Sequence, residues 1–241
     1  MSFIGKCFDR LEKLYVGAKL VLRGGQVLGA VKITVGVLTA SLAIFTVAGT
    51  LVQETKTFTI ALLPDSKEGH AQLSLSETAD FANPTTALDA GGVPQMNNIS
   101  QHWLPEDLDA YDGSHNGSNY MAYTFYVMNS GDGVGVLTEQ IHLEAGVLGA
   151  EAAIRVRLYR DGVPTTYALM GADGNPEEGT EPFGEDGIIV SYDTENFEPG
   201  AVIKYTLVIW LEGDDPECLD NIKGGQVRMS MSFSVRDPEE A

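Results

Sequence analysis

The sequence predicts an all-β protein, an antiparallel β-sandwich preceded by an N-terminal hydrophobic signal or anchor helix. Eight or nine apolar or alternating segments recur between turns rich in Gly, Pro, Asp and Asn, at the spacing of sandwich strands. Hydrophobic residues make up 44% of the 241, enough to bury a sizeable core. One stretch of 20 residues, 33–52, carries no charge and is long enough to span a bilayer.

The net charge of −19 is unevenly distributed. Residues 1–32, a basic cytoplasmic leader, carry +4, and the remainder carries −23. So acidic a domain repels phosphate backbones, which argues against nucleic acid as a partner. A positive flank before the apolar stretch predicts that the N-terminus stays inside and that residues 53–241 are exported. Residues 33–52 are then either the h-region of a signal peptide, cleaved by signal peptidase, or a retained membrane anchor.

The exported part is expected to begin with a strand over Thr55–Leu63, which alternates and then becomes fully apolar. Gln72–Ser76 alternates as a second, short strand. Residues 80–118 follow as an insertion, rich at first in Ala, Gly, Asn, Thr and Pro. Tyr120–Asn129 is a strong strand with aromatic side chains on both parities. That pattern is typical of a strand buried on one face and packed by large side chains on the other.

The middle of the chain predicts further strands over Val136–Leu148 and Ala152–Tyr159, the second of which alternates cleanly. Asp161-Gly162 is the strongest short hairpin signal in the chain. It is followed by a returning strand over Thr165–Met170. Residues 171–187 combine acidic residues, glycines and prolines, and predict a solvated loop.

The last strands are expected over Gly187–Tyr192, 201–212 and Gln226–Val235. The run 201–212 is apolar, β-branched and aromatic, and Trp210 is its largest side chain. We therefore expect Trp210 to anchor the core. In Gln226–Val235 the apolar residues fall on one parity and the serines on the other, as in a strand with one buried face.

No catalytic constellation is recognisable in the sequence, so no enzyme activity is predicted from the residues. The four histidines (His70, His102, His115 and His142) form no H-E-x-x-H zinc motif, and neither a G-x-S-x-G elbow nor a phosphate-binding loop is present. Cys7 and Cys218 lie on opposite sides of the apolar stretch, so no disulfide between them is expected. Cys218 is either a small buried hydrophobe or a thiol for pairing between molecules.

The one candidate ion site is an acidic corner after the strand 201–212. Five carboxylates fall within nine residues there, namely Glu212, Asp214, Asp215, Glu217 and Asp220. Calcium prefers clustered carboxylates on a turn, and Glu212, Asp214, Asp215 and Asp220 are its candidate ligands. The spacing does not match an EF-hand loop, and the alternative is a solvated acidic corner without an ion. No other cofactor is expected.

Three blocks together resemble the TasA/camelysin-like secreted proteins of Gram-positive bacteria, whose precursors are processed by the SipW type of signal peptidase. The blocks are Tyr120–Asn129, Ala153–Gly162 and Tyr205–Phe233, the last with W-L-E-G-D-D-P-E-C and M-S-M-S-F. The join A-G-T-L-V-Q-E-T at residues 48–55 is also similar to the family's signal-peptide boundary. Here Val52 stands where the family has alanine, so cleavage at that point, cleavage near Ala48 and an uncleaved anchor all remain open.

The resemblance implies a jelly-roll-like sandwich that is exported and retained at the cell surface or in the extracellular matrix. Some relatives polymerise into biofilm fibres when an N-terminal strand of one subunit completes the sheet of the next, a form of strand addition. The matching donor strand here comprises Thr57, Phe58, Thr59, Ile60, Ala61, Leu62 and Leu63. The alternative is an ordinary first strand that pairs within its own domain.

Three functions follow from these patterns. The first is a structural subunit of a biofilm matrix or surface fibre that self-associates by strand addition. The second is a surface binding module tethered through residues 33–52, with the loops 80–118 and 171–187 as its recognition surface. The third, a camelysin-like metalloendopeptidase, follows from the resemblance alone and lacks a zinc motif in the sequence.

Overall fold

The computed structural model describes residues 58–63, 70–93 and 95–238, all within the compact unit 55–241. They form β1 (Thr59–Leu62), β2 (Leu73–Ser76), β3 (Ala87–Asp89), η1 (Gln101–Trp103), β4 (Gly113–Ser114), β5 (Tyr120–Asn129), β6 (Gly135–Val147), η2 (Ala150–Ala152), β7 (Ile154–Arg160), β8 (Val163–Ala168), β9 (Glu181–Pro182), β10 (Ile188–Phe197), β11 (Val202–Leu211), η3 (Asp220–Ile222) and β12 (Gln226–Arg236), where η denotes a short 3₁₀ helix. The predicted leader 1–32 and apolar stretch 33–52 lie outside these residues. Within them, no helix is long and apolar enough to cross a membrane.

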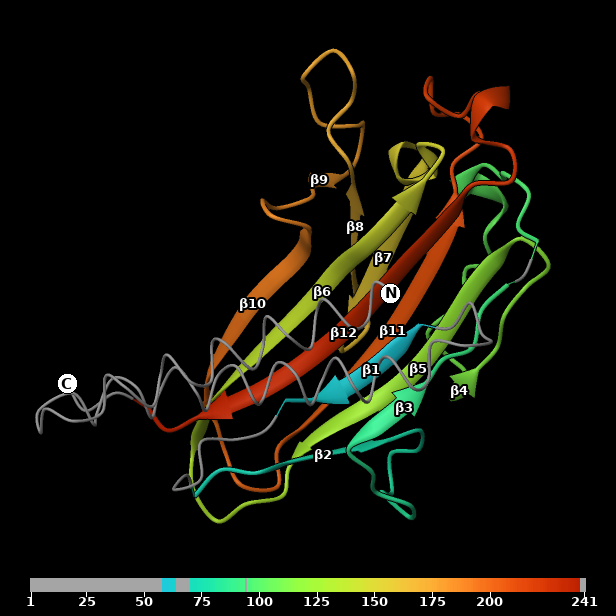
Figure 1. Cartoon of the computed structure of the whole chain (residues 1–241). Helices are drawn as coiled ribbons and strands as arrows, with labels where there is room; N and C mark the ends of the chain where they lie inside the picture. Colours follow the sequence, from blue (N-terminus) through green and yellow to red (C-terminus); the bar gives the residue numbers. More distant parts are fainter. Residues whose placement is uncertain (1–57, 64–69, 94, 239–241) are drawn as a thin grey trace, which may run out of the picture. The chain divides into compact units, whose positions relative to one another are not determined.

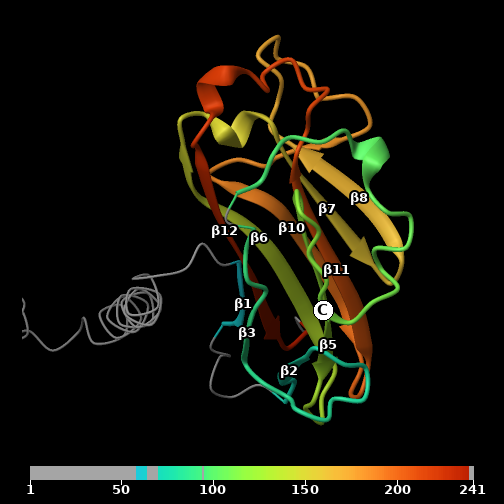
Figure 2. The ribbon, with the colours of Figure 1, turned by 90° about the vertical axis from the view of Figure 1, so that its right-hand side faces the viewer.

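The strands form two sheets that lie face to face as the layers of a sandwich (Figures 1 and 2). Sheet A has the order β10-β6-β12-β1-β3, and sheet B has the order β2-β5-β11-β7-β8-β9, with β4 also paired to β5. The prediction of an all-β sandwich is confirmed. Strand bounds agree closely where the apolar pattern is long: β5 covers the predicted Tyr120–Asn129, and β12 extends the predicted Gln226–Val235 by one residue.

Two strand pairs correct the prediction of a purely antiparallel sandwich. β1 runs parallel to β12, and the two-residue β9 runs parallel to β8. A parallel pair needs a long connection between its strands. Most of the domain lies between Leu62 and Gln226, so the chain can bring β1 and β12 together in the same direction. The remaining strand pairs are antiparallel.

The tight turn between β7 and β8 has the backbone that its sequence predicts. Asp161 and Gly162 both have positive φ, 50° and 81°. Two left-handed residues in succession are characteristic of a type I′ hairpin turn, which Asp-Gly favours because glycine has no Cβ to clash. The Asp161 side chain accepts a 2.9 Å hydrogen bond from the Lys204 backbone N–H, so the turn is also fixed to β11.

The main core lies between the sheets and is built from the inward-facing residues of both. Its centre is a group of three aromatic rings, all fully buried. Phe125 of β5 stacks on Tyr205 of β11 with ring centroids 5.4 Å apart, and Phe233 of β12 meets Phe125 edge-on at 5.8 Å. Such pairs add to the hydrophobic free energy of burying the rings. They join the central strands of sheet B to β12 of sheet A.

A second apolar cluster covers the outer face of sheet B, and Trp210 is its largest fully buried side chain, as expected of a core anchor. Trp210 lies on the side of sheet B that faces away from the other sheet, in one cluster with Ile99, Leu104 and Leu108 of the insertion. Along β11, Tyr205, Leu207 and Ile209 belong to the main core, and Val208 and Trp210 belong to the second cluster. The insertion crosses this face of sheet B (Figure 2). Part of the predicted recognition loop is therefore a structural cover.

Candidate functional site

The predicted donor strand is placed inside sheet A, between β12 and β3. Ile60 lies opposite Met231 of β12 and Leu88 of β3. Phe58 and Ile60 are buried, at 4% and 0% exposure, and both belong to the main core. The Phe58 backbone donates to Gly91 O at 3.1 Å and accepts from the Ala90 N–H at 2.9 Å. β1 thus completes its own domain in this structure; Thr57 lies outside the described residues.

The predicted calcium ligands are dispersed among different partners. Glu212 is buried and accepts hydrogen bonds from Trp210 Nε1 at 2.9 Å and from the Gln101 backbone N–H at 3.0 Å. Asp214 accepts a bond from Ser100 Oγ at 2.5 Å. These contacts fasten the corner to the insertion. Asp220 lies at the exposed surface, where its Oδ1 is 2.8 Å from Lys223 Nζ and where this pairing lowers its pKa.

Asp215 joins a different acidic group, formed with Glu177 of the 171–187 loop and with Glu217. One carboxylate oxygen of each lies within 4.8 Å of the others, and it is the one such group of three found in the described residues. The buried guanidinium of Arg155 already sits in it, 2.5 Å from Asp215 Oδ2 and 3.4 Å from Glu177 Oε2. A cation of the protein itself is therefore paired with two of these three carboxylates, Asp215 and Glu177. The structure thus groups Asp215 with Glu177 and Glu217, and it does not gather the four predicted ligands in one place.

A buried polar network in the main core escaped the sequence analysis. Glu139 of β6 is 2% exposed and accepts a hydrogen bond from the Tyr205 hydroxyl across the sandwich. Arg160, at the end of β7, places Nε 3.3 Å from Glu139 Oε2, donates to Thr194 Oγ1 of β10, and stacks on the Tyr192 ring at 4.8 Å. The sequence did contain a sign that Glu139 is buried, because it falls on the same parity of β6 as the inward-facing Leu137 and Ile141. Its partners, however, come from other strands.

Burial dominates the protonation of this network. It raises the pKa of the Glu139 carboxyl, while the hydrogen bond from Tyr205 and the charge of Arg160 act in the opposite direction. Burial beside Glu139 likewise raises the pKa of the Tyr205 hydroxyl, which stays protonated as a donor. The network joins both sheets through one carboxylate, one phenol and one guanidinium.

Replacing Glu139 with glutamine is expected to remove a pH-dependent part of the stability. The pKa of Glu139 is higher in the folded than in the unfolded protein, so its protonated carboxyl stabilises the folded state. This contribution to the free energy of unfolding is full below the unfolded pKa of about 4.3 and is lost as the pH rises through the folded pKa. Glutamine does not titrate, so the difference in free energy of unfolding, Glu139→Gln minus wild type, should increase with pH. Urea unfolding between about pH 4 and pH 8 measures it, with Glu144→Gln, an exposed carboxylate of the same strand, as control. A difference that falls with pH would contradict the assignment.

Comparisons with known proteins add little to this geometry. No protein-family model matches the chain, and no curated protein does. Among solved structures, the chain is similar to a beta-glucosidase from Kluyveromyces marxianus in complex with glucose, at 10% sequence identity and a TM-score of 0.23. The match covers 70% of this chain but only 15% of that one. A likeness of this size carries no argument about the function of the chain.

Proposed function

We propose that the chain is an exported structural subunit of a surface or matrix fibre, and that it assembles by exchange of β1 between copies. The observation that carries the proposal is the position of β1: a four-residue strand near the start of the domain that fills a place between β12 and β3. If β1 leaves its place and the β1 of a neighbouring copy enters, every contact of Phe58 and Ile60 is remade. Exchange of an identical element is a low-cost route to assembly.

Two physical features favour exchange at this place over any other in the sheet. β1 pairs with β12 in the parallel direction, which is slightly less stable per residue than antiparallel pairing. On its other side, β3 contributes only three residues. The strand is therefore held mainly by its buried side chains, and these provide the same free energy whichever copy supplies them. Exchanged repeatedly from copy to copy, β1 yields an open chain of subunits.

The wider context agrees with an extracellular role. The basic leader followed by the uncharged stretch 33–52 supports export, and the strong negative charge of the remainder supports solubility outside the cell. The resemblance to TasA/camelysin-like proteins supports a jelly-roll-like topology and a place at the cell surface or in the matrix. In that setting the partner in assembly is a second copy of the chain, and no ion or cofactor is required.

A disulfide that ties β1 to its own β3 tests the proposal. Ala61 lies opposite Ala87, and the adjacent pair is hydrogen-bonded through the Leu62 N–H and Thr86 O at 2.9 Å. Ala61 and Ala87 are therefore a non-hydrogen-bonded antiparallel pair, whose close Cβ atoms suit a disulfide. In a Cys7→Ser, Cys218→Ser background, oxidised A61C/A87C should stay monomeric in sedimentation, and reduction should restore polymers.

The same background without the two new cysteines is the control, and it should polymerise in either redox state. Polymers formed equally well by the oxidised, locked protein would rule out exchange of β1. Monomers of the control under all conditions would count against fibre assembly altogether. These two results separate the mechanism of assembly from assembly itself.

A membrane-tethered binding module is the second candidate, and one observation favours it. Trp103, on the insertion that covers sheet B, is 75% exposed. A large exposed aromatic side chain is a common anchor for a partner. N-terminal sequencing of protein from the cell surface and the medium separates the candidates, since a start at Met1 supports the tether and a start near residues 49–53 supports a released subunit.

A further inference from the structure

The two long sides of the sandwich are built differently. On one side the chain itself closes the gap between the sheets: Leu75 of β2 is bridged to Thr85, and two residues later the same segment enters β3 of sheet A. On the other side both sheets end in edge strands, β10 in sheet A and β9 in sheet B. β10 is ten residues long, and among the strands that the structure describes its one partner is β6. A long unpaired edge is a template for another strand.

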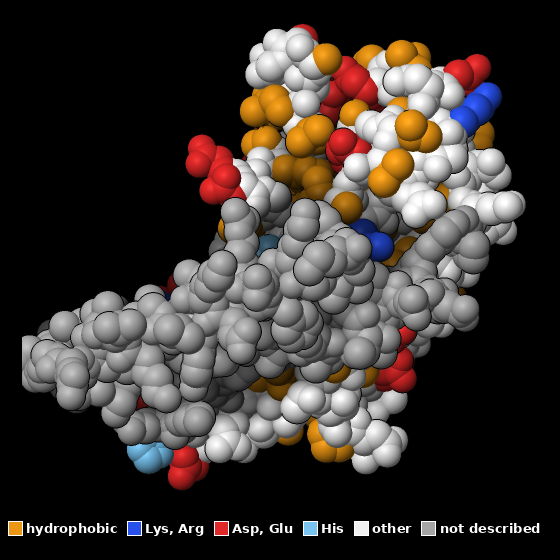
Figure 3. All heavy atoms as spheres, viewed as in Figure 1, with side chains coloured by type: hydrophobic (Ala, Val, Ile, Leu, Met, Phe, Trp, Pro, Cys, Tyr) orange, Lys and Arg blue, Asp and Glu red, His pale blue; other side chains and the backbone are white. Residues whose placement is uncertain are grey.

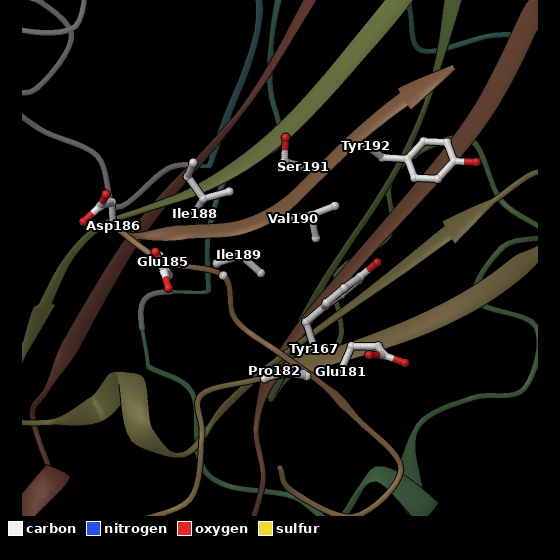
Figure 4. A pocket seen from close by; sticks show the side chains of 11 residues that line it. Tyr167, Glu181, Pro182, Glu185, Asp186, Ile188, Ile189, Val190, Ser191 and Tyr192 are labelled. Atoms are coloured by element: carbon white, nitrogen blue, oxygen red, sulfur yellow. The ribbon is translucent and has the colours of Figure 1, made fainter. Parts of the chain in front are cut away.

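A cleft of about 630 Å³ lies on this open side, between β8, β9 and β10 (Figure 4). Tyr167 of β8 and Tyr192 of β10 supply its aromatic surface, and Pro182 and Ile188 add apolar surface. Tyr192 is 52% exposed, although the Arg160 guanidinium stacks on its ring. Aromatic rings of this kind hold the aliphatic stems and charged heads of cationic side chains.

The charges that line the cleft have one sign. Glu181, Glu185 and Asp186 are exposed there, and the described residues that line the cleft include no Lys or Arg. Figure 3 shows acidic side chains projecting from the molecule beside the loop between β9 and β10. The nearby Arg160 does not balance them, because its guanidinium is already paired with the buried Glu139. The cleft therefore presents three uncompensated carboxylates to a ligand.

The backbone of β10 is regular where a strand would add. Its pairing with β6 is irregular near both ends, between Ile188 and Val190 and between Thr194 and Phe197. From Val190 to Thr194 the register is continuous, and this stretch begins inside the cleft. Peptide strands add to sheet edges through main-chain hydrogen bonds, and alternate side chains then select the sequence.

We propose that this open side binds an extended segment of a partner protein with Lys or Arg at alternate positions, which adds as a strand to β10 and places its cations over Glu181, Glu185 and Asp186. A second copy of the chain fits poorly, because two β10 edges would bring Asp193 and Glu195 against like charges. The site is separate from β1, which lies beyond β6 and β12 in sheet A. If no peptide binds along β10, the proposal that β1 is exchanged between copies is unaffected.

The test uses the full chain, purified in a neutral detergent, and a blocked octapeptide of alternating lysine and valine carrying a fluorophore. Binding is measured by fluorescence anisotropy, and hydrogen exchange reports protection along β10. We expect saturable binding that weakens with added salt and protects amides between Val190 and Thr194. Replacing the carboxylates (Glu181→Gln, Glu185→Gln, Asp186→Asn) should weaken binding roughly tenfold. Asparagine tolerates the positive φ of 55° at Asp186.

Two controls separate the site from charge alone. The variant Glu106→Gln, Glu198→Gln, Asp237→Asn removes the same number of exposed carboxylates outside the cleft and should bind like wild type. A peptide with proline in place of each valine keeps every positive charge but cannot pair as a strand, and it should not protect β10. Equal affinity of the two charge variants, equal protection by the proline peptide, or protection of β10 by self-association without peptide would each overturn the proposal.

Discussion

The variant Trp210→Ala is expected to lose roughly 3–5 kcal/mol of stability, the range found for buried aromatic residues truncated to alanine. Trp210 is fully buried and lies in the second cluster, where it packs the insertion onto the outer face of sheet B. Its Nε1 also donates to Glu212 Oε2 at 2.9 Å. The substitution leaves a cavity and removes one partner of a buried carboxylate, and both effects favour unfolding.

The substitution should also unfold the insertion locally, under conditions in which the rest of the domain remains folded. Without Trp210, the insertion loses the largest side chain that it packs against, and Ile99, Leu104 and Leu108 remain as its buried apolar residues on that face. We expect limited proteolysis to cut within residues 98–118 of the variant under conditions where wild type resists. The control is Trp103→Ala, the other tryptophan of the chain, which is 75% exposed.

Urea unfolding followed by circular dichroism measures the free energy of unfolding of both variants. Circular dichroism follows the backbone, whereas tryptophan fluorescence would lose one of its two probes in each variant. Trp103→Ala should change the free energy of unfolding by no more than about 0.5 kcal/mol. Equal destabilisation by the two substitutions would contradict the placement of Trp210 in a buried cluster. A strongly destabilised Trp210→Ala whose insertion still resists protease would show that the cover is held by other contacts.

The sequence predicted those parts of the fold that short-range patterns specify. β5, β11 and β12 could be located because apolar residues recur over nine or more positions, and the β7–β8 turn because Asp-Gly favours one backbone. The aromatic residues on both parities of β5 also predicted that each of its faces is covered. These features depend on residues adjacent in the sequence, so one chain suffices to recognise them.

The candidate site depended on contacts between distant residues and was predicted less well. Trp210 was rightly expected to be buried, but periodicity does not tell which layer covers it. Glu139 interrupts the apolar residues of one parity of β6, yet Tyr205, whose hydroxyl donates a hydrogen bond to the buried Glu139 carboxyl, lies 66 positions away in the sequence. The acidic corner looked like one cluster in the sequence, whereas the structure divides it among Ser100, Arg155 and Lys223. Carboxylate spacing alone could not reveal those partners.

The variant Arg155→Ala is expected to destabilise the domain by about 3–5 kcal/mol, the effect of removing one member of a buried ion pair. The Arg155 and Asp215 side chains are only 5% and 0% exposed, and their charged atoms are 2.5 Å apart. Without the guanidinium, Asp215 would be buried beside Glu177 and Glu217, with three carboxylates in one group and no cation of the protein among them. Desolvation and mutual repulsion then act together against the folded state.

A charge-neutral replacement of the pair separates this effect from lost packing. Arg155→Met with Asp215→Asn removes both charges, retains apolar volume on β7, and should recover much of the stability lost in Arg155→Ala. Lys223→Ala removes an exposed partner of Asp220 and should leave unfolding in urea unchanged. If added calcium stabilises Arg155→Ala but not wild type, the carboxylates can hold an ion once the guanidinium is gone. Arg155 would then be the group that keeps calcium out of the corner, and the acidic sequence pattern would be explained without a resident metal.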